Sequence, residues 1–144
     1  MTESIHPNPP HRVVDPASLA KPVGYAHAVV AAPGRTVYLA GQVGWDKNGK
    51  FPATGGLVAQ VDKALENLLV ALKECGGAPE HVVSMRIYVI STKAWRADVK
   101  AIGERWRERM GRWFPAMTLV EVRGLYEPEA LVEIEATAVV PEHP

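Results

Sequence analysis

Apolar residues recur at three- and four-residue steps between positions 57 and 75, the spacing that places side chains on one face of a helix. The positions concerned are Leu57, Val61, Leu65, Leu68, Leu69, Leu72 and Cys75. Gly76-Gly77 ends this run and Pro79 prevents its continuation, whereas Thr54 stands before it as the expected N-cap. The pattern predicts a helix over 57–75 with one buried face, on which Cys75 is a small buried hydrophobe and not a nucleophile.

The period changes to two between His81 and Ser91, which predicts a strand. On this strand Val83, Met85, Ile87 and Val89 share one face, and Ser84, Arg86 and Tyr88 share the other. A second helix is predicted over 93–110, with a buried stripe formed by Trp95, Val99, Ile102, Trp106 and Met110. Two more strands, 117–122 and 131–140, close the chain.

The N-terminal part has weaker signals. Residues 1–11 contain three prolines and no periodicity, so we expect a mobile arm there and a single domain over 12–144. Apolar runs over 27–32 and 36–40, separated by Pro33-Gly34-Arg35, predict a β-hairpin.

These elements predict an α+β fold, a two-layer sandwich in which one mixed, mostly antiparallel sheet has two helices on one face. The other face of the sheet needs a cover, which a further copy of the chain would supply. Glu133 and Glu135 alternate with apolar residues and point to that uncovered face. They form either a solvated surface or a wet cleft at a subunit interface.

Composition and charge exclude several classes of function. The 144 residues include 16 basic and 16 acidic side chains, so the bulk electrostatic attraction that nucleic-acid binding needs is absent. Arg105, Arg107, Arg109 and Arg112 lie among tryptophans and could face RNA, but we favour a solvated helix face because Glu104 and Glu108 dilute them.

Metal, cofactor and membrane signals are also lacking. The five histidines do not have metal-ligand spacing, and the glycines between 34 and 49 form no phosphate-binding fingerprint, so no metal or cofactor is predicted. One cysteine, no signal-peptide pattern and no apolar run of about 20 residues favour a cytoplasmic protein without a membrane segment.

Several short motifs occur in a characteristic order. They are Gly24-Tyr25, Leu39-Ala40-Gly41-Gln42, the helix ending at Gly76-Gly77, Phe114-Pro115-Ala116, Val120-Glu121-Val122 and Val132-Glu133-Ile134-Glu135-Ala136. From about Val13 to Val140 the chain resembles the Rid family, the reactive intermediate deaminases. The resemblance implies the Rid fold, which is chorismate-mutase-like, and a homotrimer whose sheets form a central barrel with small-molecule clefts between subunits. Members with the standard site hydrolyse imines and enamines to a keto acid and ammonia.

The resemblance also implies roles for individual residues. Tyr25 matches a tyrosine that lines the pocket, and Glu133 matches the glutamate that orients water if the segment 124–130 holds one extra residue. The family's carboxylate-binding arginine, which follows Phe-Pro-Ala, is replaced by Met117. Ala40, beside Gly41, stands where the family has serine, and Lys100 stands where it has an asparagine near the cleft.

Other residues are candidates for the same cleft. His27 follows Tyr25 by two residues, so the two side chains point the same way on an extended segment. His27 could act on the ligand as a base or as a hydrogen-bond donor. We favour the alternative, a strand histidine that is hydrogen-bonded to the backbone. Arg86 could supply the cleft with a cation from another direction. We favour the alternative, in which it forms an intersubunit ion pair with Glu121 or Glu135. Trp45 is expected either at the mouth of the cleft or in a contact between subunits of the trimer. Leu119, like Met117, is predicted to bind the substrate.

The leading hypothesis is a Rid-type protein that binds a small, uncharged or aromatic ligand between subunits and hydrolyses a C=N bond, with Glu133 and Tyr25 as catalytic residues. Losing a buried bidentate arginine contact costs about 2–5 kcal/mol, so 2-aminoacrylate is not the expected substrate. The alternative is a non-catalytic trimer that binds a metabolite or a protein. An endoribonuclease or translation inhibitor is a third interpretation, which the balanced charge disfavours.

Overall fold

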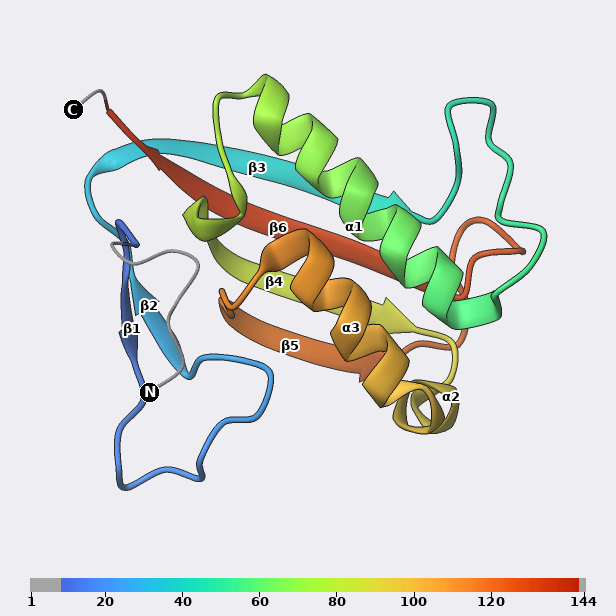
Figure 1. Ribbon diagram of the computed structural model, residues 1–144, viewed down its shortest axis with the longest axis horizontal. Helices are drawn as coiled ribbons and strands as arrows, with labels where there is room; N and C mark the ends of the chain where they lie inside the picture. Colours follow the sequence, from blue (N-terminus) through green and yellow to red (C-terminus); the bar gives the residue numbers. More distant parts are fainter. Residues whose placement is uncertain (1–8, 143–144) are drawn as a thin grey trace.

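Four strands form the central sheet of the protein, in the order β3-β6-β4-β5 (Figure 1). They are β3 (Gly34–Val43), β4 (Val82–Val89), β5 (Ala116–Glu121) and β6 (Val132–Pro141). Strand β6 runs antiparallel to both β3 and β4, whereas β4 and β5 are parallel. The computed structural model describes residues 9–142, and for these it confirms the predicted mixed, mostly antiparallel sheet.

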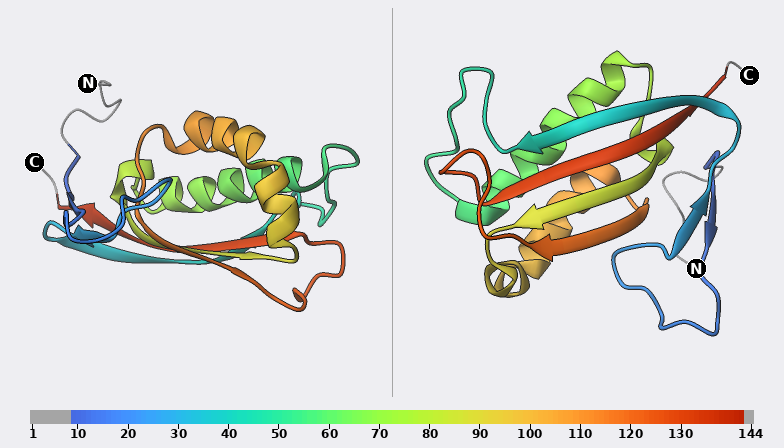
Figure 2. Two further views of the ribbon diagram at one scale, coloured as in Figure 1. Left: turned by 90° about the horizontal axis from the view of Figure 1, so that it is seen from below. Right: turned by 180° about the vertical axis from the view of Figure 1, so that it is seen from behind.

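The helices all cover one face of this sheet, as the edge-on view in Figure 2 shows. They are α1 (Gly56–Glu74), α2 (Thr92–Ala97) and α3 (Val99–Met110), and a short 3-10 helix, η1 (Pro79–His81), precedes β4. The segment α2–α3 is the crossover that parallel neighbours such as β4 and β5 require.

The prediction of one helix over 93–110 is wrong, because the chain turns at Asp98 between α2 and α3. The Ser91 hydroxyl caps α2 by accepting the Ala94 N–H at 3.0 Å. The turn changes which side chains face the sheet, so Val99 is 56% exposed instead of buried, while Ile102, Trp106 and Met110 are buried as predicted.

Helix α1 confirms its predicted apolar face: Leu65, Leu68 and Leu72 are fully buried. Two details were predicted wrongly. The N-cap is Gly55 in the left-handed conformation and not Thr54. Cys75 is exposed, because the helix ends at Glu74 and the C-cap residue no longer follows the apolar stripe.

The core lies between the helices and the sheet, and β6 shows the alternation most clearly. Its residues Val132, Ile134, Ala136, Ala138 and Val140 are buried. Glu133 and Glu135 alternate with them and point to the uncovered face, as predicted. In β4 the register shifts between Val82 and Ser84, so the extra residue in this irregularity is Val83, and Val82 is buried in its place.

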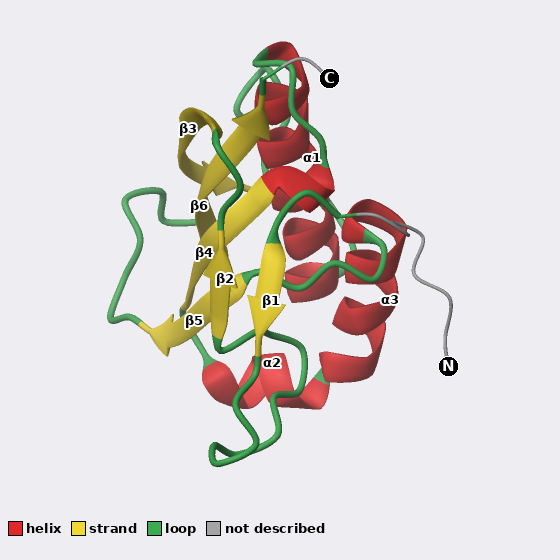
Figure 3. Ribbon diagram, turned by 90° about the vertical axis from the view of Figure 1, so that its left-hand side faces the viewer, coloured by secondary structure: helices red, strands yellow, loops and turns green. Residues whose placement is uncertain are grey.

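The predicted hairpin over 27–40 is wrong. Strand β2 (Ala28–Val30) pairs with β1 (Arg12–Val14) in a separate two-stranded sheet, whereas β3 pairs with β6. Figure 3 shows β1 and β2 beside the main sheet. Pro33-Gly34 therefore passes the chain from one sheet to the other and does not reverse it.

His11 connects the two sheets. Its ring is 3% exposed; Nδ1 accepts the Ala32 N–H at 2.9 Å, and Nε2 donates to the Val139 carbonyl at 2.8 Å. The mobile arm was predicted for residues 1–11. Residues 1–8 lie outside the described part of the chain, and the last arm residue, His11, is packed into the fold.

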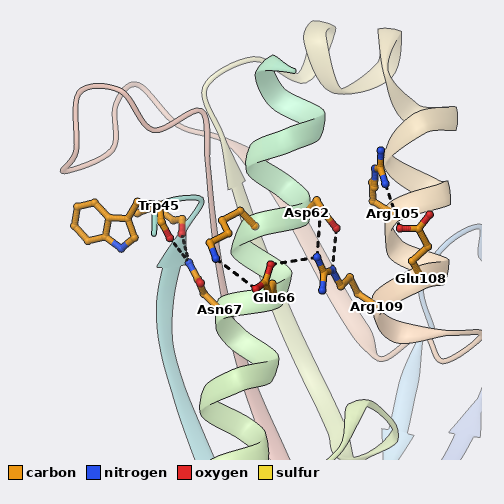
Figure 4. Close-up of polar contacts among 9 residues, drawn as sticks. Trp45, Asp62, Glu66, Asn67, Arg105, Glu108 and Arg109 are labelled. Atoms are coloured by element: carbon orange, nitrogen blue, oxygen red, sulfur yellow. Dashed lines mark hydrogen bonds and ion pairs between the residues drawn. The ribbon is translucent and has the colours of Figure 1, made fainter. Parts of the chain in front are cut away.

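The outer surface of the helices is joined by ion pairs (Figure 4). The Arg109 guanidinium on α3 bonds both carboxylate oxygens of Asp62 on α1, at 2.9 and 3.2 Å, and also Glu66 at 3.2 Å. Within α3, Arg105 pairs with Glu108 at 3.2 Å. Much of the basic run on this helix is therefore neutralised by nearby carboxylates.

Candidate functional site

The extended segment around Ala26 adds to the edge of the sheet next to β5. Ala26 pairs with Ala116 in a parallel bridge, and its N–H donates to the Pro115 carbonyl at 3.0 Å. Ala26 is buried, and Tyr25 and His27 on either side of it have their rings edge to face, with centroids 5.4 Å apart. The structure thus brings these two predicted site residues together.

His27 is fixed by two hydrogen bonds. Its backbone N–H donates to Asp15 Oδ1 at 2.8 Å, and its ring Nε2 lies 2.7 Å from the Ala20 carbonyl. A carbonyl oxygen only accepts, so Nε2 holds the proton and Nδ1 is an acceptor in the neutral ring. The backbone-bonded role that the sequence favoured for this histidine matches this geometry.

An apolar cavity of about 400 Å³ lies between the helix-facing side of β4–β5 and the α2–α3 segment. Its aromatic and aliphatic wall includes Tyr25, Trp95, Trp106, Phe114, Met117 and Leu119. Trp106 and Phe114 are stacked in parallel, with centroids 5.7 Å apart. Thr92 and Arg96 on α2 add polar groups to this wall. Such a cavity suits the apolar part of a small ligand.

A second, polar pocket of about 260 Å³ lies beside it. Its lining comes from the segment 25–27, β4 and β5, and includes the polar or charged residues Tyr25, His27, Ser84, Arg86 and Thr118. Tyr25 and Met117 line both cavities. The two spaces therefore share Tyr25 and Met117, although Ser84, Arg86 and Thr118 belong to the sheet face opposite the one covered by the helices.

The electrostatics of the uncovered sheet face centre on Tyr88 and Glu135. The Tyr88 hydroxyl donates to Glu135 Oε1 at 2.5 Å. This bond, with repulsion from the carboxylate, raises the pKa of Tyr88 above its ordinary value of 10.0, because ionising the phenol would lose the donated proton beside a negative charge. Tyr88 therefore stays neutral at physiological pH.

Glu133 lies elsewhere on the sheet, against the bulge in β3. A Cβ on Gly41 would stand 2.9 Å from the Glu133 carboxyl group, so a larger residue at this position would require the Glu133 side chain to move. Ala40 precedes it at the register shift between Leu39 and Gln42. Strand β4 separates β6 from β5, and Glu133 lines neither of the two cavities. One chain thus presents two groups of predicted site residues, near opposite edges of the sheet.

The comparisons with known proteins agree on one family. Residues 16–140 match the family model described as Endoribonuclease L-PSP. The RutC family protein UK114 of Drosophila melanogaster is 35% identical over 128 residues, 88% of each chain. The 2-iminobutanoate/2-iminopropanoate deaminase of Dermatophagoides farinae is 30% identical over 132 residues, 91% of this chain and 98% of the mite protein. The crystal structure of the Rid-family protein YyfB from Yersinia pestis superposes with a TM-score of 0.80 at 36% identity, covering 91% of this chain and 99% of that one.

The chain belongs to the Rid family.

Two other predicted site residues of this Rid protein lie away from both cavities. Lys100 is exposed on α3 and is not part of either wall. Trp45 follows β3 at the opposite edge of the sheet, where its carbonyl accepts from Asn67 at 2.8 Å (Figure 4). Its ring packs on Phe51. In the order of strands, Trp45 at the end of β3 is next to Glu133 on β6, whereas Tyr25 is at the other edge, beside β5.

Sequence reasoning missed several residues of the Rid cavity. Trp95, Ile102 and Trp106 were assigned to a helix stripe, and their spacing gave no sign that part of this stripe lines a cavity. Phe114 was visible in the Phe-Pro-Ala motif. Arg96 had no signal, because its position at the cavity depends on the turn at Asp98.

Among residues 9–142, no helix is long and apolar enough to cross a bilayer, and no three His, Cys, Asp or Glu side chains come close enough to hold a metal ion.

Proposed function

We propose that this Rid protein forms a homotrimer, binds a small molecule in clefts between its subunits, and hydrolyses a C=N bond in it. The observation that supports this most directly is the separation of the two residue groups. Tyr25, His27 and Met117 lie at the β5 edge, whereas Glu133, Gly41 and Ala40 lie toward the β3 edge. A cleft formed by the β5 edge of one subunit and the β3–β6 side of the next would join them around one ligand.

The uncovered sheet face supports such an assembly. Tyr38 on β3 is 82% exposed and Val120 on β5 is 41% exposed, and both belong to this sheet. Exposed apolar side chains on one sheet face favour a covering partner. Light scattering coupled to size exclusion should give three times the 15.7 kDa protomer mass.

The chemistry assigned to these residues balances with water as the only co-substrate. Glu133 accepts a proton from water as the oxygen attacks the imine carbon, and the proton returns to the nitrogen of the tetrahedral carbinolamine. The hydroxyl proton of the carbinolamine then passes to the same nitrogen, with Glu133 as the relay, as the C–N bond breaks to give a carbonyl compound and ammonia. Tyr25 donates a hydrogen bond to the ligand; within residues 9–142 its hydroxyl has no other hydrogen-bond partner.

Met117 changes the expected substrate. A thioether cannot neutralise a carboxylate, so this position contributes an apolar wall between the two cavities. The 400 Å³ cavity lined by Trp95, Trp106 and Phe114 suits larger apolar groups than 2-aminoacrylate presents. We therefore expect turnover of bulky apolar imines, and little turnover of 2-aminoacrylate.

The test is imine hydrolysis with matched variants. An amino-acid oxidase forms imines in situ from leucine, phenylalanine or alanine, and semicarbazide traps what the protein does not hydrolyse. We expect the protein to lower semicarbazone formation most for phenylalanine, and Glu133→Gln to lose this effect by about 100-fold, within the usual range for removing a general base. Glu142→Gln, just beyond the far end of β6, is the control and should keep full activity.

A non-catalytic trimer is the competing function, and the same cavity favours it equally. It predicts that apolar ligands raise the melting temperature while no imine shows turnover that depends on Glu133. An RNA-directed activity is disfavoured, because Arg105 and Arg109 of the basic run are paired with Glu108 and with Asp62 and Glu66. Strong, salt-dependent retention of RNA would restore it.

A further inference from the structure

We infer that the indole N–H of Trp95 donates a hydrogen bond to the ligand in the apolar cavity, and that this cavity recognises an aromatic ketone or imine without needing a carboxylate on it. The ligand class is then aromatic compounds with a C=O or C=N acceptor, uncharged ones included. This inference rests on the proposed function, because it takes the cavity beside Tyr25 as the ligand site. It makes Trp95 a specificity-determining residue.

The first argument is that the groups concerned lie on one face of the sheet. In the register of the parallel pair β4–β5, Met117 is beside Met85. Two residues further along, Leu119 is beside Ile87. Met85 and Ile87 are buried in the core under the helices, so Met117 and Leu119 face the same side. Trp95 reaches the cavity on that side from α2, and one ligand can contact all of these residues without crossing the sheet.

The second argument is the hydrogen bonding of the tryptophans around the core. Trp106 Nε1 donates to the Trp113 carbonyl at 3.2 Å, and Trp113 Nε1 donates to the Val82 carbonyl at 2.8 Å. Trp95 is half-buried on the cavity wall, and within residues 9–142 its indole N–H forms no hydrogen bond. An indole nitrogen only donates, and tryptophans away from water normally pair this group. A ligand acceptor in the cavity would satisfy it.

The third argument is that the other polar groups of the wall also favour a ligand acceptor. The Tyr25 hydroxyl has no hydrogen-bond partner in the described part of the chain. The Thr92 hydroxyl is already directed to Glu121 Oε1, at 3.5 Å. Among the described residues, the wall includes no carboxylate that could accept from the ligand. Because an indole N–H keeps its proton, Trp95 orients the C=N group while the proton transfers stay with Glu133.

The fourth argument is the aromatic character of the wall. The rings of Trp106 and Phe114 are stacked in parallel with centroids 5.7 Å apart, and Trp95 lines the same cavity. Aromatic pairs contribute binding beyond the area that they bury. The wall therefore favours an aromatic group over an aliphatic group of similar size.

Arg96 is the cation that could bind a ligand carboxylate instead. It follows Trp95 on α2 and lines the cavity, and in the described part of the chain it has no ion-pair partner. Arg96 is exposed, so its charge is hydrated, and a carboxylate paired with it would gain no more than about 5-fold in affinity. Met117 adds no charge on the sheet side. The aromatic ring and the acceptor therefore dominate binding.

The experiment uses three probes with one carbon skeleton. They are phenylacetone, propylbenzene, which lacks the carbonyl acceptor, and phenylpyruvate, which has a carboxylate in place of the methyl group of phenylacetone. Each is titrated into the 15N-labelled full-length protein, and chemical shifts give the Kd. The chain has four tryptophans and hence four indole N–H signals, of which Trp95→Phe identifies the one from Trp95.

In the unmodified protein, phenylacetone should bind about 10-fold more tightly than propylbenzene, because its carbonyl accepts from Trp95 and Tyr25. Phenylacetone should also move the Trp95 indole proton signal downfield, as a new hydrogen bond does, and propylbenzene should not. Phenylpyruvate should bind within about 5-fold of phenylacetone.

Two matched variants isolate the donor. Trp95→Phe keeps an aromatic ring and removes the N–H, so it should weaken phenylacetone about 3- to 10-fold more than it weakens propylbenzene. Trp106→Phe makes the same change in the same wall, but its N–H already serves the Trp113 carbonyl. It should therefore change both probes by the same factor. Circular dichroism and size exclusion establish that each variant is folded and assembled.

The inference is overturned if none of the probes binds, if Trp95→Phe weakens phenylacetone and propylbenzene equally, or if phenylacetone leaves the Trp95 indole signal in place. It is also overturned if phenylpyruvate binds more than about 5-fold more tightly than phenylacetone, and loss of that difference in Arg96→Gln would assign the carboxylate to Arg96. Its failure is distinct from failure of the proposed function. Turnover that depends on Glu133 but not on Trp95 would leave hydrolysis standing, whereas acceptor-selective binding through Trp95 without turnover would support the inference alone.

Discussion

Replacing Arg109 by methionine would remove the guanidinium that joins α3 to α1 and keep an unbranched side chain in its place. The side chain of Arg109 is 32% exposed and that of Asp62 is 25% exposed, so the bidentate pair is partly shielded from water. Exposed ion pairs contribute about 0.2–1 kcal/mol, and fixed bidentate geometry with a second carboxylate raises this value. We expect Arg109→Met to lower the free energy of unfolding by about 1–2 kcal/mol at pH 7.

The pH dependence follows from the pKa of Asp62. The hydrogen bonds from Arg109 hold this pKa below its ordinary value of 3.8 in the folded protein. A carboxyl group with a lowered folded pKa contributes stability that is present above the unfolded pKa and is lost as the pH falls toward the folded pKa. The difference between the unmodified protein and Arg109→Met should therefore be full at pH 7 and shrink below about pH 4.

The assay is urea unfolding at fixed protomer concentration, because stability of an oligomer depends on concentration. Arg109→Met, Asp62→Asn and the double variant form a cycle whose coupling free energy isolates the pair. Arg105→Met is the control, since Arg105 pairs only with exposed Glu108 within its own helix, and it should cost under about 0.5 kcal/mol. A loss for Arg109→Met that is as large at pH 3 as at pH 7 would refute the electrostatic explanation and indicate lost packing.

Three further outcomes are expected. Gly44→Ala places a Cβ 2.5 Å from the Gln60 carbonyl oxygen, so it should destabilise the protein by about 1–3 kcal/mol in urea, whereas Gly103→Ala, with open space around it on α3, should be neutral or stabilising; equal effects would contradict the steric argument. His11→Ala removes the hydrogen bonds to Val139 of β6 and to Ala32 in the β2–β3 connection and should cost about 1–3 kcal/mol, with faster amide exchange in β1 and β2; unchanged exchange would contradict this role. Met117→Arg adds a second cation at the pocket and should lower the Kd for pyruvate about 10-fold in calorimetry; an unchanged Kd would show that this position does not face the carboxylate.

The sequence by itself determined the elements whose side chains alternate between core and solvent. The face of α1 from Leu57 to Leu72 and the alternation of β6 were readable because burial imposes periods of 3.6 and 2 directly on the residues. The motifs around Tyr25, Gly41 and Glu133 identified the family, because these short stretches occur in a characteristic order along the chain. At Gly41, for example, a larger residue would displace the carboxyl group of Glu133.

Only the tertiary structure decided features that depend on distant partners. The residues before Pro33 were expected to pair with those after it, but β2 pairs with β1 because hydrogen bonding between strands is not encoded by local pattern. The turn at Asp98 moved Val99 to the surface and brought Arg96 to the cavity, although both sit in one apparently continuous helical stripe. Arg86 lies beside Thr118, and Met85 beside Met117, because β4 and β5 are parallel and in this register. Register between strands is set by the packing of the whole sheet, and no short stretch of sequence specifies it.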